Sequence, residues 1–312
     1  MDRRTLGSTG IKVSEIGLGA WQLGDTDQWA GPDRATSLAI VDEALNLGVN
    51  LFDTAPGYAG GRSELILGEA LDGRRDQVVL VTKFGHRADG TSNWDVARIE
   101  PAIEQSLLAL RTDHLDVILM HSPPAELLDG RIAKHYEEFE RLKAAGVVRA
   151  YGASVDWAAD IDLVTDTTGS QVLEVLLHAF HQEPLPALEK AATKGVGVIV
   201  KVPLDSGWLA GRYGKDASFS DVRSRWSRAD IERRAALVEQ FKELLPDAAS
   251  MPHTALRWLL AQRSVTSVIP GAKSVAQLKD NVAAATETIP AETARAIESL
   301  WAKKIEGSPL PW

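Results

Sequence analysis

The sequence predicts an α/β fold of the (β/α)8 class, the TIM barrel. Short apolar segments of strand length recur along the 312 residues, and helical segments lie between them. Several helical segments end in a glycine where a left-handed cap is expected, as at Gly48, Gly146 and Gly195. The length also suits a barrel of eight strands and eight helices.

The elements follow one another in the order that such a barrel requires. A short β-hairpin is expected over residues 6–13. Eight apolar segments then qualify as buried parallel strands: residues 16–18, 49–52, 78–82, 117–120, 148–151, 172–177, 196–200 and 265–269. Helices are expected between them, including residues 35–47, 63–71, 95–110, 131–144, 185–193 and 253–261.

An open, doubly wound sheet is the rival fold. It normally carries a G-x-G-x-x-G turn after its first strand, but the segment that begins at Gly17 has Gln22 in place of the third glycine. The barrel is therefore favoured. Two long loops, 87–94 after the third strand and 210–227 after the seventh, are expected to bind substrate at the C-terminal face. With no Pro/Ser-rich linker, residues 1–312 are expected to form one domain.

Composition excludes several classes of function. Hydrophobic residues make up 45% and charged residues 25%, as is usual for a globular protein. The net charge of -9 argues against nucleic acid or an anionic membrane as partner. Cysteine is absent, which excludes disulfides and thiolate metal sites. No apolar run has the length of a membrane span, and the N-terminus has no apolar signal segment, so a cytoplasmic protein is expected. A monomer or a weak homo-oligomer is also expected.

Four polar residues are predicted to carry the chemistry. Asp53, Lys83 and His121 each directly follow a predicted strand, and Tyr58 lies on the loop after Asp53. Because the C-terminal ends of barrel strands share one face, these side chains can converge. Each of these residues alone also fits a purely structural role: Asp53 could cap a turn, and Lys83 could be an ordinary surface lysine.

Together the four side chains suit the protonation of a carbonyl oxygen. A free phenol has a pKa of about 10, too high for an efficient acid at neutral pH. A nearby ammonium lowers that pKa, and an aspartate keeps the buried lysine charged. A histidine beside the same point can donate a hydrogen bond to a carbonyl oxygen.

With these motifs the chain resembles the aldo-keto reductases, of the bacterial NADP-dependent type. The resemblance runs from the hairpin to about Asn281. It is carried by 17–21 (GLGAW), 53–58 (DTAPGY), Ser63-Glu64, Leu67-Gly68, Thr82-Lys83, 121–123 (HSP), 152–154 (GAS) and 269–273 (IPGAK). It implies a carbonyl reductase that uses NADPH, with NADH as the less favoured cofactor. Tyr58 would be the general acid, Lys83 and Asp53 would tune it, and His121 would orient the carbonyl.

The resemblance also implies a cofactor site. Ser154 matches the residue that holds the nicotinamide carboxamide, residues around 203–212 match the loop over the pyrophosphate, and those around 271–281 match the adenosine and 2′-phosphate segment. The phosphate assignment agrees with a predicted helix N-terminus beside Lys273. The full set is Gly19, Ala20, Trp21, Asp53, Ser154, Glu174, Lys201, Pro203, Leu204, Gly207, Leu209, Gly211, Arg212, Gly271, Lys273, Gln277 and Asn281.

Three positions depart from the family pattern. Val155 stands where asparagine is usual, Glu174 where glutamine is usual, and Lys201 where an aromatic residue commonly stacks on the nicotinamide. An ionised Glu174 can accept a hydrogen bond from the carboxamide but cannot donate one. Lys201 is expected to reach either a phosphate or another acid.

Aromatic residues and a histidine on the loops are expected to line the substrate pocket with Tyr58: Trp21, Phe84, His86, Trp94 and Trp226. A metal site is not expected, because no closely spaced histidine pair occurs early in the chain. Two alternatives to a reductase are a Schiff-base aldolase with Lys83 as nucleophile and a cofactor-binding regulatory subunit like the potassium-channel β subunits.

Overall fold

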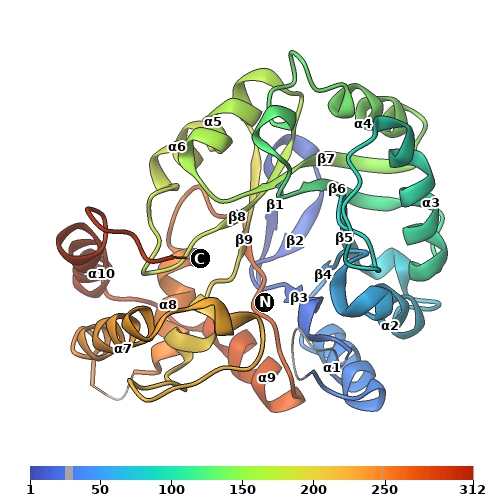
Figure 1. The fold of residues 1–312 in the computed structure, drawn as a ribbon. Helices are drawn as coiled ribbons and strands as arrows, with labels where there is room; N and C mark the ends of the chain where they lie inside the picture. The colour runs from blue at the N-terminus through green and yellow to red at the C-terminus, as the bar shows by residue number, and fades with distance from the viewer. Residues whose placement is uncertain (25–30, 248, 312) are drawn as a thin grey trace.

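Most strands of this protein form one closed parallel sheet. The structure, a computed structural model, describes residues 1–24, 31–247 and 249–311. In these residues eight parallel strands are neighbours in chain order (Figure 1). They are β3 Leu18–Gly19, β4 Leu51–Asp53, β5 Val79–Phe84, β6 Leu115–His121, β7 Val148–Val155, β8 Val172–Leu176, β9 Gly197–Lys201 and β10 Ser267–Val268.

Backbone hydrogen bonds between the first and last strand segments close the sheet. The amide of Gly17 donates to the carbonyl of Val268 at 2.8 Å, and the amide of Val268 donates to the carbonyl of Glu15 at 2.9 Å. A parallel bridge also pairs Gly19 with Gly271. The predicted (β/α)8 barrel is confirmed.

Helices surround the strands on all sides of the barrel (Figure 1). They are α1 Arg34–Asn46, α2 Arg62–Ala70, α3 Ile99–Leu110, α4 His135–Ala144, α5 Ala158–Thr167, α6 Leu185–Thr193, α7 Arg228–Lys242, α8 Met251–Leu260, α9 Val275–Ala283 and α10 Ala291–Lys304. The helix expected from residue 131 begins at His135, because Asp129 accepts the amide of Arg131 and holds a turn there.

The sequence pattern did not single out α5, α7 or α10. Helix α7 has a local signal that was overlooked, a capping box in which Ser227 and Asp230 satisfy each other's backbone amides. Its apolar residues are sparse, and Arg234 on its inner face is buried. The apolar period that normally reveals a helix is therefore weak in this segment.

Successive side chains along each strand alternate between the barrel interior and the layer between the strands and the helices. The interior cluster contains Leu51, Val79, Val81, Val117, Leu119, Ala150, Val172, Ile199 and Ile269. It also includes Leu6, Ile11 and Val13 from the hairpin of β1 (Arg3–Thr5) and β2 (Lys12–Ser14). The amide of Ser8 donates to Gly195 just before β9, so the predicted hairpin closes the N-terminal end of the barrel.

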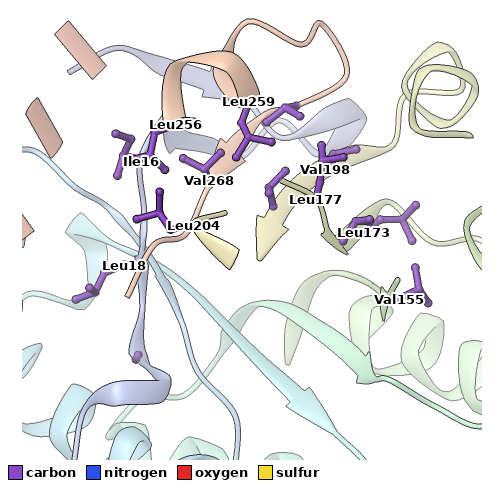
Figure 2. Close-up of a cluster of buried hydrophobic side chains, with 14 of the residues drawn as sticks. Ile16, Leu18, Val155, Leu173, Leu177, Val198, Leu204, Leu256, Leu259 and Val268 are labelled. Carbon is purple, nitrogen blue, oxygen red and sulfur yellow. The ribbon is translucent and has the colours of Figure 1, made fainter. Parts of the chain in front are cut away.

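The outer layer packs the helices on the strands. Figure 2 shows part of it, where Leu256 and Leu259 of α8 lie close to Ile16 and Val268. Both long βα loops are present. Residues 85–95 lead from β5 towards α3 and include a bridge between His86 and Ser92. Residues 202–227 lead from β9 to α7. No helix of the described residues is long and apolar enough to cross a membrane.

A histidine joins α8 to the chain beyond α9. His253 Nδ1 lies 2.6 Å from a carboxylate oxygen of Glu287, and its Nε2 lies 3.1 Å from Asp280. Partial burial lowers the pKa of His253, but Glu287 and Asp280 raise it more, so the net pKa lies above its usual value.

This pair of contacts predicts a pH-dependent contribution to stability. A histidine whose pKa is higher in the folded state stabilises the fold fully at a pH below its unfolded-state pKa of about 6.5. This stabilisation is lost as the pH rises through the folded-state pKa. In urea unfolding, the stability difference between wild type and His253→Gln should therefore be larger at pH 6 than at pH 8.5. In the Glu287→Gln background, the effect of His253→Gln on stability should be smaller. An effect of His253→Gln that does not change with pH would contradict the assignment.

Candidate active site

Side chains that point into the barrel change from apolar to polar towards the C-terminal ends of the strands. On β5 the inward residues are Val79 and Val81, followed by Lys83. Because inward positions recur every second residue, neighbouring strands make the same change. The inward polar residues near these ends are Asp53, His121, Ser154, Glu174 and Lys201.

Lys83 lies at the centre of a buried charge cluster, defined here as Lys83, Asp53 and Glu174. Its Nζ donates to both carboxylate oxygens of Asp53, at 2.7 and 2.6 Å, and to the carbonyl of Thr54 at 2.9 Å. Glu174 Oε2 lies 3.2 Å from the same nitrogen. The three side chains are at most 3% exposed. An ammonium this deep needs such partners to offset the loss of hydration.

The charge cluster determines which of its members are ionised. Burial lowers the pKa of Lys83, but the charges of Asp53 and Glu174 outweigh it, so the net pKa lies above its usual value. Burial and the charge of Glu174 raise the pKa of Asp53 well above its usual value. Burial also raises the pKa of Glu174, but Lys83, Asp53, Lys201 and Ser154 together more than offset it, so the net pKa lies below its usual value. Lys83 is thus a stable ammonium shared by two carboxyl groups.

Tyr58 lies over this ammonium. Its ring centroid is 4.9 Å from Lys83 Nζ, and the ring stacks on Trp21 with centroids 5.8 Å apart. The edge of His121 meets the same ring at 5.6 Å. The Ser63 hydroxyl donates to the carbonyl of Ala20 at 2.8 Å, which ties the start of α2 to the loop that bears Trp21. The predicted set Asp53, Tyr58, Lys83 and His121 is thus brought together.

Burial holds the proton on Tyr58 and removes it from His121. Burial raises the pKa of Tyr58 above its usual value, and the Lys83 ammonium opposes this only in part. The lowering expected from Lys83 is therefore present but smaller than the effect of burial. Burial, together with the charge of Lys83, holds the pKa of His121 well below its usual range. At neutral pH the site contains a neutral phenol, a neutral imidazole and an ammonium.

A second polar group continues from the charge cluster. The Ser154 hydroxyl donates to Glu174 Oε1 at 3.0 Å, and Lys201 Nζ donates to the Ser154 hydroxyl at 2.8 Å. Lys201 Nζ also lies 2.9 Å from Asp156 Oδ1. Of the two partners expected for Lys201, the structure therefore shows an acid. Asp156 was missed, although its place two residues after Ser154 was a usable signal.

A cavity of about 320 Å³ opens above these residues. Its wall includes most of the predicted cofactor residues: Gly19, Trp21, Asp53, Glu174, Lys201, Pro203, Leu204, Gly207, Arg212, Gly271, Lys273 and Gln277, with Tyr58 and His121. The other predicted cofactor residues are not on this wall: Ala20, Ser154, Leu209, Gly211 and Asn281. The wall also contains residues that were not predicted: Gln22, Ser122, Asp156, Val202, Ser206, Ala210, Tyr213, Arg223, Ile269 and Pro270.

The loop after β9 has unusual backbone geometry where it meets the cavity. Val202, Asp205 and Ser206 have φ values of 53°, 46° and 52°, a left-handed conformation that non-glycine residues seldom adopt. The buried Arg234 of α7 holds this loop, because its Nε lies 3.3 Å from Asp205 Oδ2. His178 Nε2 lies 3.6 Å from the other oxygen of Asp205.

One end of the cavity is basic. Lys273, Arg212 and Arg223 all line it. Burial and the charges of the two arginines lower the pKa of Lys273, partly countered by Asp221. Beside it Ser274 caps the N-terminus of α9, and its side chain accepts a hydrogen bond from the amide of Gln277 at 3.1 Å. Cationic side chains at a helix N-terminus suit an anionic group such as phosphate.

The predicted substrate residues are divided between the site and the core. His86 meets His121 at 4.8 Å and Trp94 at 5.5 Å between ring centroids, so ring contacts connect these two to the site, although neither lines the cavity. Phe84, the outward-facing last residue of β5, is 2% exposed and packs against Phe139. Trp226 is 5% exposed and packs in a cluster with Trp208 and Phe219. Both therefore lie among core aromatic residues.

No group of three or more His, Cys, Asp or Glu side chains in the described residues has the arrangement of a metal site.

Comparisons with known proteins show the family to which this chain belongs. The model of the aldo/keto reductase family matches residues 15–302. An uncharacterized oxidoreductase of Bacillus subtilis, YqkF, is 33% identical over 96% of both chains. The NADH-specific methylglyoxal reductase of Escherichia coli is 30% identical over 96% of this chain and all of its own. The holo form of an aldo-keto reductase from Bacillus halodurans superposes with a TM-score of 0.82, at 29% identity over 96% of both chains.

The chain therefore belongs to the aldo/keto reductase family. Its relatives and structural neighbours make it an oxidoreductase.

The charge cluster predicts a large effect of removing its cation. Lys83→Met leaves the carboxyl groups of Asp53 and Glu174 buried without the Lys83 ammonium, and should destabilise the fold by about 3–5 kcal/mol at neutral pH. The loss should grow as pH rises, because the carboxyl groups must then ionise unpaired. Urea unfolding of Lys83→Met beside Lys83→Met/Asp53→Asn checks this. The double variant should recover part of the loss, and no recovery would contradict the cluster.

Proposed function

We propose that this protein reduces an aldehyde or a ketone to an alcohol, with NADPH as the reductant. The observation that carries the proposal is the position of the Tyr58 phenol, over the buried Lys83 ammonium and beside His121 at the cavity wall. A neutral acid, a fixed positive charge and a hydrogen-bond donor thus face one point. Each of these three groups favours the transfer of a proton to a carbonyl oxygen.

The residues present fit a nicotinamide dinucleotide. Two positions of the wall exclude any side chain, since a Cβ on Gly19 would lie 2.7 Å from the Ile269 carbonyl oxygen and one on Gly271 would lie 1.8 Å from Gln22 Oε1. Glu174 Oε2 is a buried acceptor without a hydrogen bond, which suits the N–H of a carboxamide. The basic end of the cavity suits the phosphates.

The side chains of the site would act on the carbonyl as follows. The nicotinamide, when bound, supplies a hydride to the carbonyl carbon. Tyr58 keeps its proton until the oxygen becomes basic, and then transfers it. Lys83 stabilises the phenolate that remains, and Asp53 keeps Lys83 charged and in place. The neutral imidazole of His121 donates to the carbonyl oxygen and holds it near the phenol.

NADPH is proposed over NADH on the strength of the basic end. Lys273, Arg212 and Arg223 lie together there, and a 2′-phosphate is the group that distinguishes the two nucleotides. The relative from Escherichia coli is named an NADH-specific enzyme, so the family includes both preferences. A small carbonyl compound bounded by Trp21, His86 and Trp94 is the proposed substrate.

The geometry bears on the two alternatives. A Schiff-base aldolase needs Lys83 as a neutral amine, whereas the carboxyl groups around Lys83 keep its pKa above the usual value. A regulatory subunit that binds the nucleotide without turnover is compatible with the same fold, and turnover assays decide it. We also propose one domain over residues 1–312, a cytoplasmic location and a monomer or weak homo-oligomer.

Tyr58→Phe tests the acid. Loss of the proton donor should reduce kcat for carbonyl reduction by about 10²–10⁴-fold. Nucleotide affinity should be essentially unchanged, because the ring is retained. Steady-state kinetics and tryptophan-fluorescence titration measure the two effects. Tyr136→Phe is the matched control, since that hydroxyl is buried without a hydrogen bond outside the site. A near-normal kcat in Tyr58→Phe would remove Tyr58 as the acid.

Lys273→Ala tests the nucleotide preference. A charged hydrogen bond to the 2′-phosphate would be lost, so the Kd for NADPH should rise about 10-fold or more while that for NADH changes little. Lys279→Ala, on the helix that follows Lys273, is the matched control, because the Lys279 ammonium pairs with Glu43 at 3.0 Å. Equal losses for both nucleotides would show that Lys273 does not contact the 2′-phosphate.

A further inference from the structure

A second cavity lies outside the site described above. It has a volume of about 320 Å³ and forms where the segments that lead into α5 and α6 meet α10 and the chain after it (Figure 1). Its lining shares no residue with that of the first cavity. The reduction proposed above makes no use of this second cavity.

Two tryptophans form aromatic walls of the second cavity. Trp157 directly precedes α5 and is 43% exposed, which is unusual for a tryptophan, whereas Trp301 of α10 is 7% exposed. The ring of His181 contacts both indole rings at nearly right angles, with centroid distances of 5.1 Å to Trp157 and 6.2 Å to Trp301. His181 Nε2 lies 3.1 Å from the carbonyl oxygen of Asp156. The two indole rings are therefore held in place before a ligand binds.

Carboxylates supply the charge of the second cavity. Glu183, Glu298 and Glu306 line it, and no lysine or arginine of the described residues does so. None of the three carboxylates has a salt bridge within the part of the chain that the structure describes. Glu183 is fixed next to Trp157, because one of its carboxylate oxygens accepts the amide of Ala158 at 2.9 Å. The charge of this cavity therefore favours a cation as ligand.

An amide oxygen without a hydrogen bond also belongs to the second cavity. Gln182 lines the cavity and is only 4% exposed. Its Nε2 donates to the carbonyls of Ala179 at 2.9 Å and of Ile297 at 3.3 Å, whereas its Oε1 accepts no hydrogen bond from the described residues. Polar atoms of side chains as buried as this one normally have a partner. This oxygen is thus an acceptor that is left for a positively charged ligand.

The walls indicate which kind of cation fits. The face of an indole ring is negative and attracts a cation that lies over it. A small metal ion would lose its strongly bound water against such apolar walls. A methylated ammonium group spreads its charge over methyl groups, which can contact indole rings and carboxylates at the same time.

We propose that the second cavity binds an organic cation through a methylated ammonium group. The group lies against Trp157 and Trp301, and the carboxylates of Glu298 and Glu306 and the amide oxygen of Gln182 surround it.

A titration with choline chloride tests this site. Choline carries a trimethylammonium group, and its carbon analogue carries a neutral tert-butyl group of the same shape. Each group gives one sharp proton NMR signal, so line broadening measures the binding of both compounds at the same ionic strength. We expect choline to bind saturably and about 10-fold more tightly than the analogue. Equal binding of the two compounds, or no saturable binding of choline, would overturn the proposal.

Substitutions of Trp157 assign the binding to the second cavity. Trp157→Leu keeps an apolar side chain but removes the ring, so it should weaken choline binding about 5-fold or more. Trp157→Phe keeps a ring and should retain most of the affinity. If Trp157→Leu binds choline as tightly as wild type does, the cation binds elsewhere and the proposal is wrong. Thermal unfolding shows whether each variant is folded.

A carboxylate gives an independent test if Trp157→Leu does not fold. Glu298→Gln should weaken choline binding about 3-fold and leave the binding of the neutral analogue unchanged. Glu292→Gln is the matched control, because Glu292 is an exposed carboxylate of the same helix that does not line the cavity. If Glu292→Gln weakens choline binding as much as Glu298→Gln does, choline responds only to the net charge of the protein, and the site is refuted.

Discussion

A buried ammonium between two carboxyl groups is the interaction on which this site depends. Taking Lys83 out of water costs several kcal/mol, and only partners at hydrogen-bond distance offset that cost. Asp53 and Glu174 come from β4 and β8, which are not neighbours of each other in the sheet. Their carboxyl groups reach the same nitrogen because closure of the sheet brings β4 and β8 face to face across the interior of the barrel. The charge cluster is thus a product of barrel closure.

The apolar part of the barrel makes these charges effective. Below the cluster the interior is filled by aliphatic side chains, and the N-terminal hairpin adds Leu6, Ile11 and Val13 at the far end. Water is therefore kept from one side, and the local dielectric constant is low. Electrostatic effects on Tyr58 and His121 are stronger there than at a surface. The same burial keeps the phenol neutral and the imidazole uncharged.

Strand ends were predictable because they follow from local chemistry. Runs of apolar residues that end in Asp53, Lys83 and His121 mark both the strands and the face to which they point. Side-chain direction was harder to predict. Phe84 follows Lys83 directly, yet it points outward into the core because strand residues alternate. Trp226 is an aromatic residue on a long loop, which suggested a place in the substrate pocket, but tertiary packing places it against Trp208 and Phe219.

By itself, the sequence determined the barrel class, the order of its strands and the set Asp53, Tyr58, Lys83 and His121. Periodicity and residue type are local properties, and they carried that information. Only the tertiary structure decided that Glu174 shares the Lys83 ammonium, that Lys201 faces Asp156, and that Arg234 holds the loop at Asp205. Such contacts join residues far apart in the chain, and their distances exist only once the strands have closed on one another.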